Sequence, residues 1–190
     1  NEHDEKSIYE PQRWGIPVEK IKSLGPKLRE HWRRFRQRFK SKTRDTSEHA
    51  LAYMQGQMTM ESDRNFAGIA ESMENADGQA LQHFMSNSPW NGQGVFEQIR
   101  DEIKEKPELA SESLLILDEY ADEKAGGESV GTLRQYNGRM GKVDMCQVAV
   151  GLGYANWKLE PWPMWAMVDA EIFLPEAWFG DEYAELRQKV

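Results

Sequence analysis

One acidic side chain directly follows a short apolar run near the middle of the chain. Residues 114–117 are Leu, Leu, Ile and Leu, and Asp118 and Glu119 come next. A continuous apolar run of this length predicts a buried β-strand, which here ends by presenting the Asp118 carboxylate to solvent. Carboxylates are the hard oxygen ligands that Mg²⁺ prefers. Asp118 is therefore the first candidate for catalytic chemistry and for metal binding.

Two further strands are predicted downstream of this acid. One covers residues 144–154 and the other covers residues 165–175, with short turns that contain Gly, Asn and Pro between the strands. Together with residues 113–119 they predict an antiparallel three-strand sheet. Three consecutive strands with an acid at the tip of the first favour a ribonuclease-H-like sheet.

Other interpretations of these acids compete with the first. Four apolar residues followed by Asp-Glu are also typical of a Walker B strand, but the phosphate loop G-x-x-x-x-G-K-[ST] occurs nowhere, so an ATPase is excluded. Asp118 can also be a residue that only caps a turn. Asp144, Asp169 and Glu171 are conceivable further metal ligands, although solvation of strand edges accounts for them better.

Composition limits the class of protein. The chain has 190 residues, of which 39% are hydrophobic, and its seven Trp can fill a core, so we expect a globular protein. Its predicted helices and strands together indicate the α+β class. A single cysteine, Cys146, gives no disulfide framework and no zinc spacing, which favours a reducing cytoplasm. No apolar stretch approaches the ~20 residues that cross a bilayer, and residues 1–5 do not resemble a signal peptide. We expect a cytoplasmic protein with no membrane contact.

The charge of the chain is divided unevenly. Residues 12–44 hold twelve Lys or Arg against two Glu, a balance of +10, whereas the whole chain carries −8 and the remainder therefore carries −18. Within this segment Leu28, Trp32, Phe35 and Phe39 recur at steps of four, three and four, which predicts one apolar stripe on a helix over residues 26–40.

The other faces of this predicted helix are basic and can neutralise several phosphates at once. The DNA-binding candidates on it are Arg29, Arg33, Arg34, Arg36, Arg38 and Lys40. A second interpretation is a solvated charged face that docks through its aromatic stripe, with acids of the same chain as its counter-charge. A third is a protein-interaction module in which the basic helix meets an acidic partner.

The chain is predicted to be helical from residue 45 to about residue 106. Thr46 or Ser47 should cap one helix, Asp63 a second, and Asp77 or Gly78 a third, and a fourth should run from Gly94. This gives an N-terminal helical bundle in two parts, a basic segment at 1–44 and a DNA-binding-like region at 45–107, before a sheet region at 108–190. No pair of the four histidines has metal-binding spacing with another donor, so zinc is not expected.

Residues 122–142 form a glycine-rich stretch beside the predicted first strand. A hairpin there exposes backbone and cations near Asp118, and it can clamp a DNA phosphate or simply be solvated. Its DNA-binding candidates are Lys124, Arg134, Arg139 and Lys142. Tyr136 and Trp157 could stack on an unpaired base, but packing explains them better.

Longer strings of the sequence resemble a known family. Residues 114–119, 122–126, 129–131, 134–138 and 141–148, in this order, are similar to the DDE-superfamily transposases of bacterial insertion sequences. Residues 77–84 and 88–90 look like the helical domain that precedes catalysis in this group, and residues 168–169 and 174–178 look like its third-strand region. The resemblance spans roughly residues 46–181.

This resemblance implies a transposase that binds the terminal inverted repeats of its element and cuts and joins double-stranded DNA. It implies an Asp, Asp, Glu triad that holds two divalent ions, Mg²⁺ or Mn²⁺, and a homodimer on DNA. Two metals ~3.5–4 Å apart can activate the nucleophile and stabilise the leaving oxygen of a phosphodiester. By motif position Asp118 matches the first acid, and Glu119 is given no catalytic role.

The other two acids of the triad have no counterpart in the usual order. In this fold the second Asp ordinarily follows the fourth strand, and the Glu lies on a later helix. The chain is therefore expected to be the N-terminal portion of such a transposase, with the first part of a ribonuclease-H-like domain. The alternative is a non-catalytic, transposase-derived DNA-binding protein or regulator that occupies the same repeats.

Overall fold

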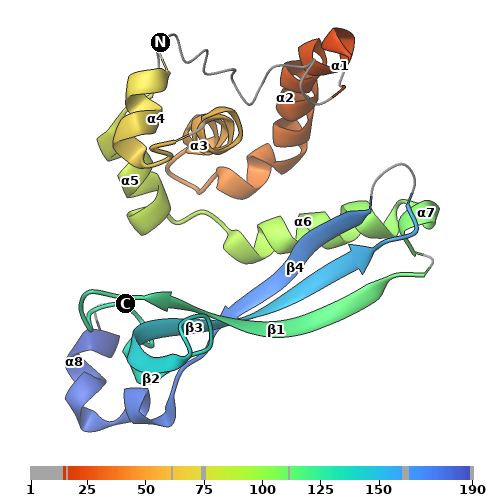
Figure 1. Cartoon of the computed structure of the whole chain (residues 1–190). Coiled ribbons are helices and arrows are strands. Elements are labelled where there is room, and N and C mark those ends of the chain that lie inside the picture. Colours follow the sequence, from red (N-terminus) through yellow and green to blue (C-terminus); the bar gives the residue numbers. More distant parts are fainter. Residues whose placement is uncertain are drawn as a thin grey trace, which may run out of the picture. The chain divides into compact units, whose positions relative to one another are not determined.

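The computed structural model describes residues 15, 17–60, 62–73, 76–110, 112–159 and 163–188 (Figure 1). Arg13 of the basic segment and the acidic start at 1–5 lie outside this part. The chain forms two compact units, one up to Val95 and one from Phe96 onward. No helix among the described residues is long and apolar enough to cross a membrane. The division at residues 44 and 107 stays a prediction.

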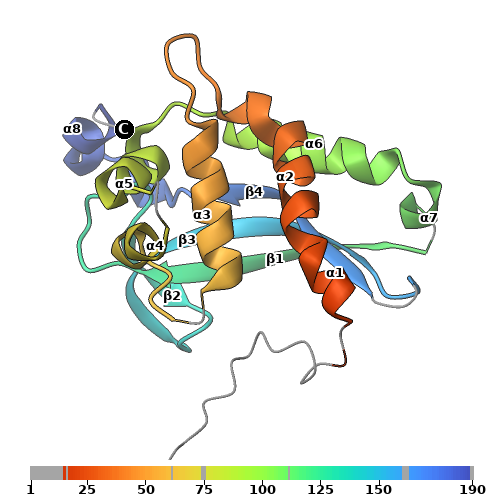
Figure 2. The same cartoon turned by 90° about the horizontal axis from the view of Figure 1, so that it is seen from above.

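The first unit consists of short helices. They are α1 (Val18–Lys22), α2 (Leu24–Phe35), the 3-10 helix η2 (Arg36–Phe39), α3 (Ser47–Thr59), α4 (Phe66–Ser72) and α5 (Gly78–Asn87), and α6 (Gly92–Lys104) begins at the end of this unit. Figure 2 shows α2 and α3 side by side. The Trp32 indole N–H donates a hydrogen bond of 2.8 Å to the Ser47 carbonyl oxygen, so these two helices are also joined by a buried polar contact.

The predicted aromatic stripe is confirmed. Trp32, Phe35 and Phe39 are buried and Leu28 is half-buried. The single helix expected over residues 26–40 is wrong at its end, because the last turn tightens into η2 from Arg36 onward. Such 3-10 turns are frequent at helix ends. Beyond the tighter turn the Phe39 ring lies among aromatic neighbours, 5.9 Å from Phe84 and 5.5 Å from Trp90 between centroids.

The helix starts follow the sequence except at α4 and at α6, which begins at Gly92 and not at the predicted Gly94. Thr46 precedes α3, and the Asp77 carboxylate accepts a hydrogen bond of 2.7 Å from the Ala80 N–H at the start of α5, as predicted. The cap of α4 was expected at Asp63 but is Asn65, whose side chain accepts from the Gly68 N–H. Asp63 instead has a φ of 51°, a left-handed conformation that Asp tolerates in turns.

The second unit combines the end of α6 with a sheet. It contains α7 (Pro107–Ala110), β1 (Leu114–Glu123), β2 (Leu133–Asn137), β3 (Lys142–Asn156), β4 (Met164–Ile172), the 3-10 helices η3 (Glu176–Phe179) and η4 (Asp181–Tyr183), and α8 (Ala184–Arg187). The long β3 is central, with β1 along one edge and β2 and β4 sharing the other (Figure 1). All pairs are antiparallel, so the expected α+β class and antiparallel sheet are confirmed.

The sheet has one strand more than the three expected. The additional strand, β2, lies within the glycine-rich stretch and is only five residues long. Short strands of this kind carry too few side chains to give a clear alternating pattern. Gly141, with a φ of 66°, is part of the turn that joins β2 to β3, where a side chain would be strained.

Helices α6 and α7 cover one face of the sheet. Leu109, Tyr154 and Val168 form the buried core there, with Ile99 and Ile103 packed against them. The Tyr154 hydroxyl donates to the Leu109 carbonyl oxygen and so ties α7 to β3. We call this the helix-covered face of the sheet.

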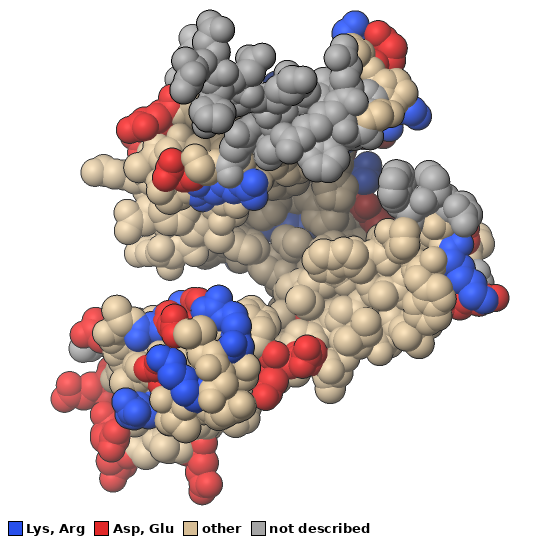
Figure 3. Space-filling model, in the orientation of Figure 1, with Lys and Arg blue, Asp and Glu red and all other residues tan. Residues whose placement is uncertain are grey.

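The apolar start of β1 is not buried, and this corrects the sequence prediction. Leu115 and Leu117 are 67% and 72% exposed, although they share the helix-covered face with Tyr154 and Leu152, their partners on β3. The reason is positional, because the helical cover packs over β3 and β4 while β1 lies at the edge. Figure 3 shows the resulting uncharged surface along this part of the sheet.

Candidate functional site

Asp118 lies in the middle of β1, not at its tip. It is followed by five further strand residues that pair with β3, and its own partner is Gly151. Residues 119–123 continue the pairing with β3 although most of them are polar, because their side chains are solvated. A prediction from the apolar run alone could not detect this extension of the strand. The carboxylate is exposed and accepts a hydrogen bond of 2.9 Å from the Glu119 N–H.

The pairing register separates Asp118 from the acids of β4. Directly paired residues project from the same face, and neighbours along a strand alternate. Asp118 pairs with Gly151, whereas Asp169 pairs with Leu152 and Glu171 pairs with Val150. Asp169 and Glu171 are therefore on the helix-covered face and Asp118 is on the opposite face.

Asp144 belongs to the same set as Asp169 and Glu171. It stands an even number of residues before Val150 and Leu152 on β3, so it projects from the helix-covered face. None of these three acids can share a metal ion with Asp118 across the sheet. Glu119 pairs with Val150 and therefore also projects away from the Asp118 face.

Asp169 is additionally engaged by a cation. The Arg100 guanidinium on α6 lies 3.2 Å from the Asp169 carboxylate and donates a hydrogen bond of 2.7 Å to the Val168 carbonyl oxygen. Within the part of the chain that the structure describes, no group of three or more His, Cys, Asp or Glu could hold a metal ion. Asp118 has the right donor chemistry for Mg²⁺ or Mn²⁺, but the described residues do not assemble a complete metal site around it.

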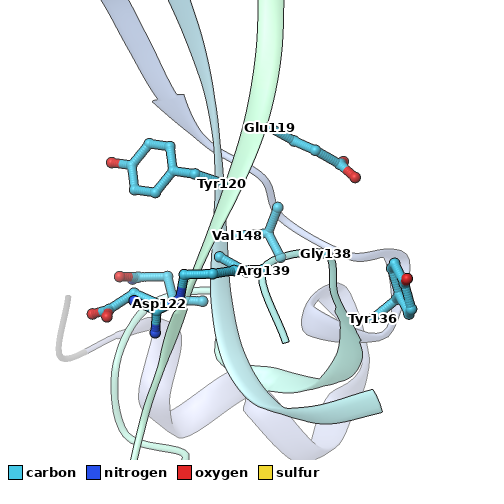
Figure 4. Close-up of a pocket in the computed structure, with 9 residues that line it drawn as sticks. Glu119, Tyr120, Asp122, Tyr136, Gly138, Arg139 and Val148 are labelled. Carbon is cyan, nitrogen blue, oxygen red and sulfur yellow. The ribbon is translucent and has the colours of Figure 1, made fainter. Parts of the chain in front are cut away.

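A cleft of about 460 Å³ lies further along β1, beside the turn between β2 and β3. Its lining includes Glu119, Tyr120, Asp122, Tyr136 and Arg139 (Figure 4). Figure 4 shows the Arg139 side chain extended toward Asp122. Both tyrosines are more than half exposed, so the expectation that Tyr136 packs in a core is wrong.

Acids accompany the cations of this hairpin. Lys124 lies 2.7 Å from Asp122, Lys142 lies 2.6 Å from Asp144, and Arg139 lies 3.9 Å from Glu123. The hydrogen bond from Lys124 lowers the pKa of Asp122, and the one from Lys142 lowers the pKa of Asp144, to which the charge of Arg134 adds. Figure 3 shows the same mixture of positive and negative side chains at this end of the sheet. The pairing favours local charge balance over a phosphate clamp.

The candidates on α2 and η2 divide into two groups. Arg36 lies 3.6 Å from Asp45 and 3.9 Å from Glu48, and Lys40 lies 2.9 Å from Asp45, so these two cations hold the start of α3. Arg29 and Arg33 are exposed, are one helical turn apart, and form no ion pair with another described residue.

The remaining two arginines of this segment differ in exposure. Arg34 is exposed and lies 2.9 Å from the Nδ1 atom of His31, which leaves its guanidinium near the surface. Arg38 is half-buried. We call Arg29, Arg33 and Arg34 the exposed arginine face. These three residues, rather than all six, have the exposure that contact with a DNA backbone requires.

Asp45 was not singled out from the sequence, yet it organises this region. Its carboxylate accepts hydrogen bonds from the Ser47 hydroxyl at 2.5 Å and the Ser47 N–H at 3.1 Å. These bonds, together with that from Lys40, lower the pKa of Asp45 from 3.8 to about 2. The sequence signal was an acid at the end of a basic run, next to a helix-capping residue.

We expect Asp45→Asn to destabilise the first unit by about 0.5–1 kcal/mol at pH 7, a small effect because the side chain is 42% exposed and screened by solvent. The pKa of Asp45 is lower in the folded state, so its contribution is full above about pH 4 and is lost as the pH falls toward 2. Urea unfolding of both proteins at pH 7 and pH 2.5 measures this. A difference that stays constant between these pH values would contradict the assignment.

The sequence of the chain is similar to known proteins. Residues 34–190 match the model of a family described as DDE superfamily endonuclease. A probable transposase for insertion sequence element IS701 from Microchaete diplosiphon is 37% identical over 76 residues, an alignment that covers 38% of this chain and 19% of that protein. The matched part thus spans about a fifth of the length of this relative. No solved structure matches the chain.

Proposed function

The chain belongs to the DDE superfamily endonuclease family, and from this premise we propose that it is the end-binding portion of an insertion-sequence transposase. In this proposal it binds double-stranded DNA at the terminal inverted repeats of the element. The enzyme to which it contributes cuts the DNA at these ends and joins it to a target. A homodimer on DNA would bring two ends together.

The exposed arginine face is the observation that carries the DNA-binding part of the proposal. Arg29, Arg33 and Arg34 lie on one helix whose apolar stripe is buried, so the helix is anchored and its cations face solvent. Exposed guanidinium groups on an anchored helix can each neutralise a phosphate of the DNA backbone. The hairpin candidates remain a prediction, although their acidic partners make them poorer phosphate ligands.

The proposed catalytic contribution of this chain is Asp118. Endonucleases of this superfamily generally use divalent metal ions. Asp118 is exposed on β1 and lines an open pocket of about 430 Å³, which leaves its carboxylate accessible to further ligands and to DNA. Asp118 has the place of the first acid in this proposal, and the described residues do not complete a metal site around it.

A second candidate function has a specific observation in its favour. The acids nearest in the sheet project from the other face, and Asp169 is paired with Arg100. A chain that binds element ends without Asp144, Asp169 or Glu171 on the Asp118 face would act as a non-catalytic regulator. It would then compete with an active transposase for the same repeats.

The variant Asp118→Asn distinguishes the transposase candidate from the regulator candidate. The same experiment also shows whether neither candidate is right. We expect this variant to bind element-end DNA within about twofold of wild type, because Asp118 lies in a different compact unit from the exposed arginine face. If the transposase candidate is right, a transposase that contains this portion nicks supercoiled element DNA with Mn²⁺, and the Asp118→Asn change in it abolishes the nicking. End binding without nicking by either protein supports the regulator, and equal binding to unrelated DNA contradicts both.

A further inference from the structure

A second feature of the first unit has the composition of an anion site. An open pocket of about 480 Å³ is formed by the segment before α3, by α3 and by α5. We call it the imidazole pocket, and its lining residues are Arg44, Asp45, Thr46, His49, Ala80, His83 and Ser88. The Thr46 hydroxyl already donates to the Phe39 carbonyl oxygen, which leaves four side chains that can donate hydrogen bonds to an oxyanion, namely Arg44, His49, His83 and Ser88.

Local contacts hold these donors in place. The backbone around Arg44 is fixed by a turn in which the Ser41 N–H donates to the Arg44 carbonyl oxygen at 2.8 Å, while the guanidinium remains exposed. The Ser88 hydroxyl lies 3.4 Å from the Nδ1 atom of His83. The His49 ring packs beside the buried Phe84, with 6.4 Å between centroids. The donors therefore converge from three separate segments.

The charge of the pocket is positive. Its single carboxylate, Asp45, is balanced by Lys40 at 2.9 Å and by Arg36 at 3.6 Å, so its charge is not available to oppose an anion. Glu48 on α3 also pairs with Arg36, at 3.9 Å between its carboxylate and the guanidinium. Helix α5 carries no Lys, Arg, Asp or Glu. Arg44 is thus the uncompensated charge among the lining residues.

The pocket follows the basic helix directly in the chain. Lys40 and Asp45 form an isolated β-bridge, which closes the loop that carries Arg44 back onto the end of η2. We propose that the imidazole pocket binds a single phosphate of the DNA backbone, next to those contacted by the exposed arginine face. This inference rests on the proposed function, because it takes DNA as the source of the phosphate.

The test uses the full chain with a duplex that carries an element end. We expect Arg44→Ala and His83→Ala each to weaken binding about three- to tenfold, and Arg44→Ala to reduce the slope of log affinity against log salt by about one. Lys42→Ala is the matched control, because it removes an exposed cation from the same loop outside the pocket. Arg44→Ala and His83→Ala affinities that equal the Lys42→Ala affinity overturn the proposal.

Neutral methylphosphonate substitutions, made one at a time along the duplex, locate the phosphate. One position should weaken wild-type binding and have no further effect on His83→Ala, because both changes remove the same contact. Additive losses at every position overturn the proposal even if the variants bind weakly for another reason.

Inorganic phosphate provides the arm that does not depend on DNA binding. We expect millimolar phosphate, but not chloride of equal ionic strength, to shift the ring resonances of His49 and His83 in wild type. If the protein shows these shifts but does not bind DNA, the pocket is a site for free phosphate and the proposed function is wrong. Absence of the shifts overturns the inference itself.

Discussion

Replacing Arg29, Arg33 and Arg34 together by Ala is expected to reduce affinity for element-end DNA on the order of a hundredfold at about 0.1 M salt. Each guanidinium that neutralises a phosphate releases a counterion, so three lost contacts should lower the salt slope by about 2.7. The loss should be similar on unrelated DNA, because phosphate contacts carry no sequence information directly. Fluorescence anisotropy across a salt series measures both quantities.

The chain offers a control with the same change in charge. Lys124→Ala, Arg134→Ala and Lys142→Ala together also remove three positive charges, but from the hairpin, where Lys124 and Lys142 pair with acids. We expect this triple variant to bind within about threefold of wild type, since two of its three cations already pair with acids. Equal losses in both variants would show that net charge alone governs binding and would remove the special role of α2.

The contrast between these two sets marks the limit of what the sequence could predict. The stripe of Trp32, Phe35 and Phe39 is a local periodic pattern, so the sequence predicted both the helix and the face that it buries. Which cations remain exposed depends on acids that the fold brings near, such as Asp45 beside Arg36. All ten basic candidates therefore looked alike before the structure distinguished them.

The same reasoning explains the acidic strand. The sequence correctly predicted that residues 114–119 are extended, because β-branched and apolar residues favour a strand. It could not predict that β1 lies at the sheet edge, where Leu115 and Leu117 stay exposed, because strand order is set by long-range pairing. Nor could it assign Asp118 and Asp169 to opposite faces, since a shift of one residue in register reverses every side chain.

Trp32→Ala is expected to have the largest effect on stability, a loss of about 3–5 kcal/mol from the first unit. The side chain is 7% exposed, and the substitution leaves a cavity between α2 and α3. It also removes the donor to the Ser47 carbonyl oxygen and the ring on which Arg36 stacks, 5.2 Å from its centroid. Urea unfolding monitored by circular dichroism measures the loss.

Two further substitutions identify the source of this loss. Trp165→Ala removes the same group where the side chain is 79% exposed, so we expect a change within about 0.5 kcal/mol. Trp32→Phe keeps an apolar ring but leaves the Ser47 carbonyl oxygen without its indole donor, which costs about 1–3 kcal/mol. Because Trp32 anchors the helix that presents Arg29 and Arg33, Trp32→Ala should also weaken DNA binding at temperatures where the second unit remains folded. A Trp32→Ala protein as stable as Trp165→Ala would mean that the aromatic stripe does not anchor α2, and the exposed arginine face would lose its rigid support.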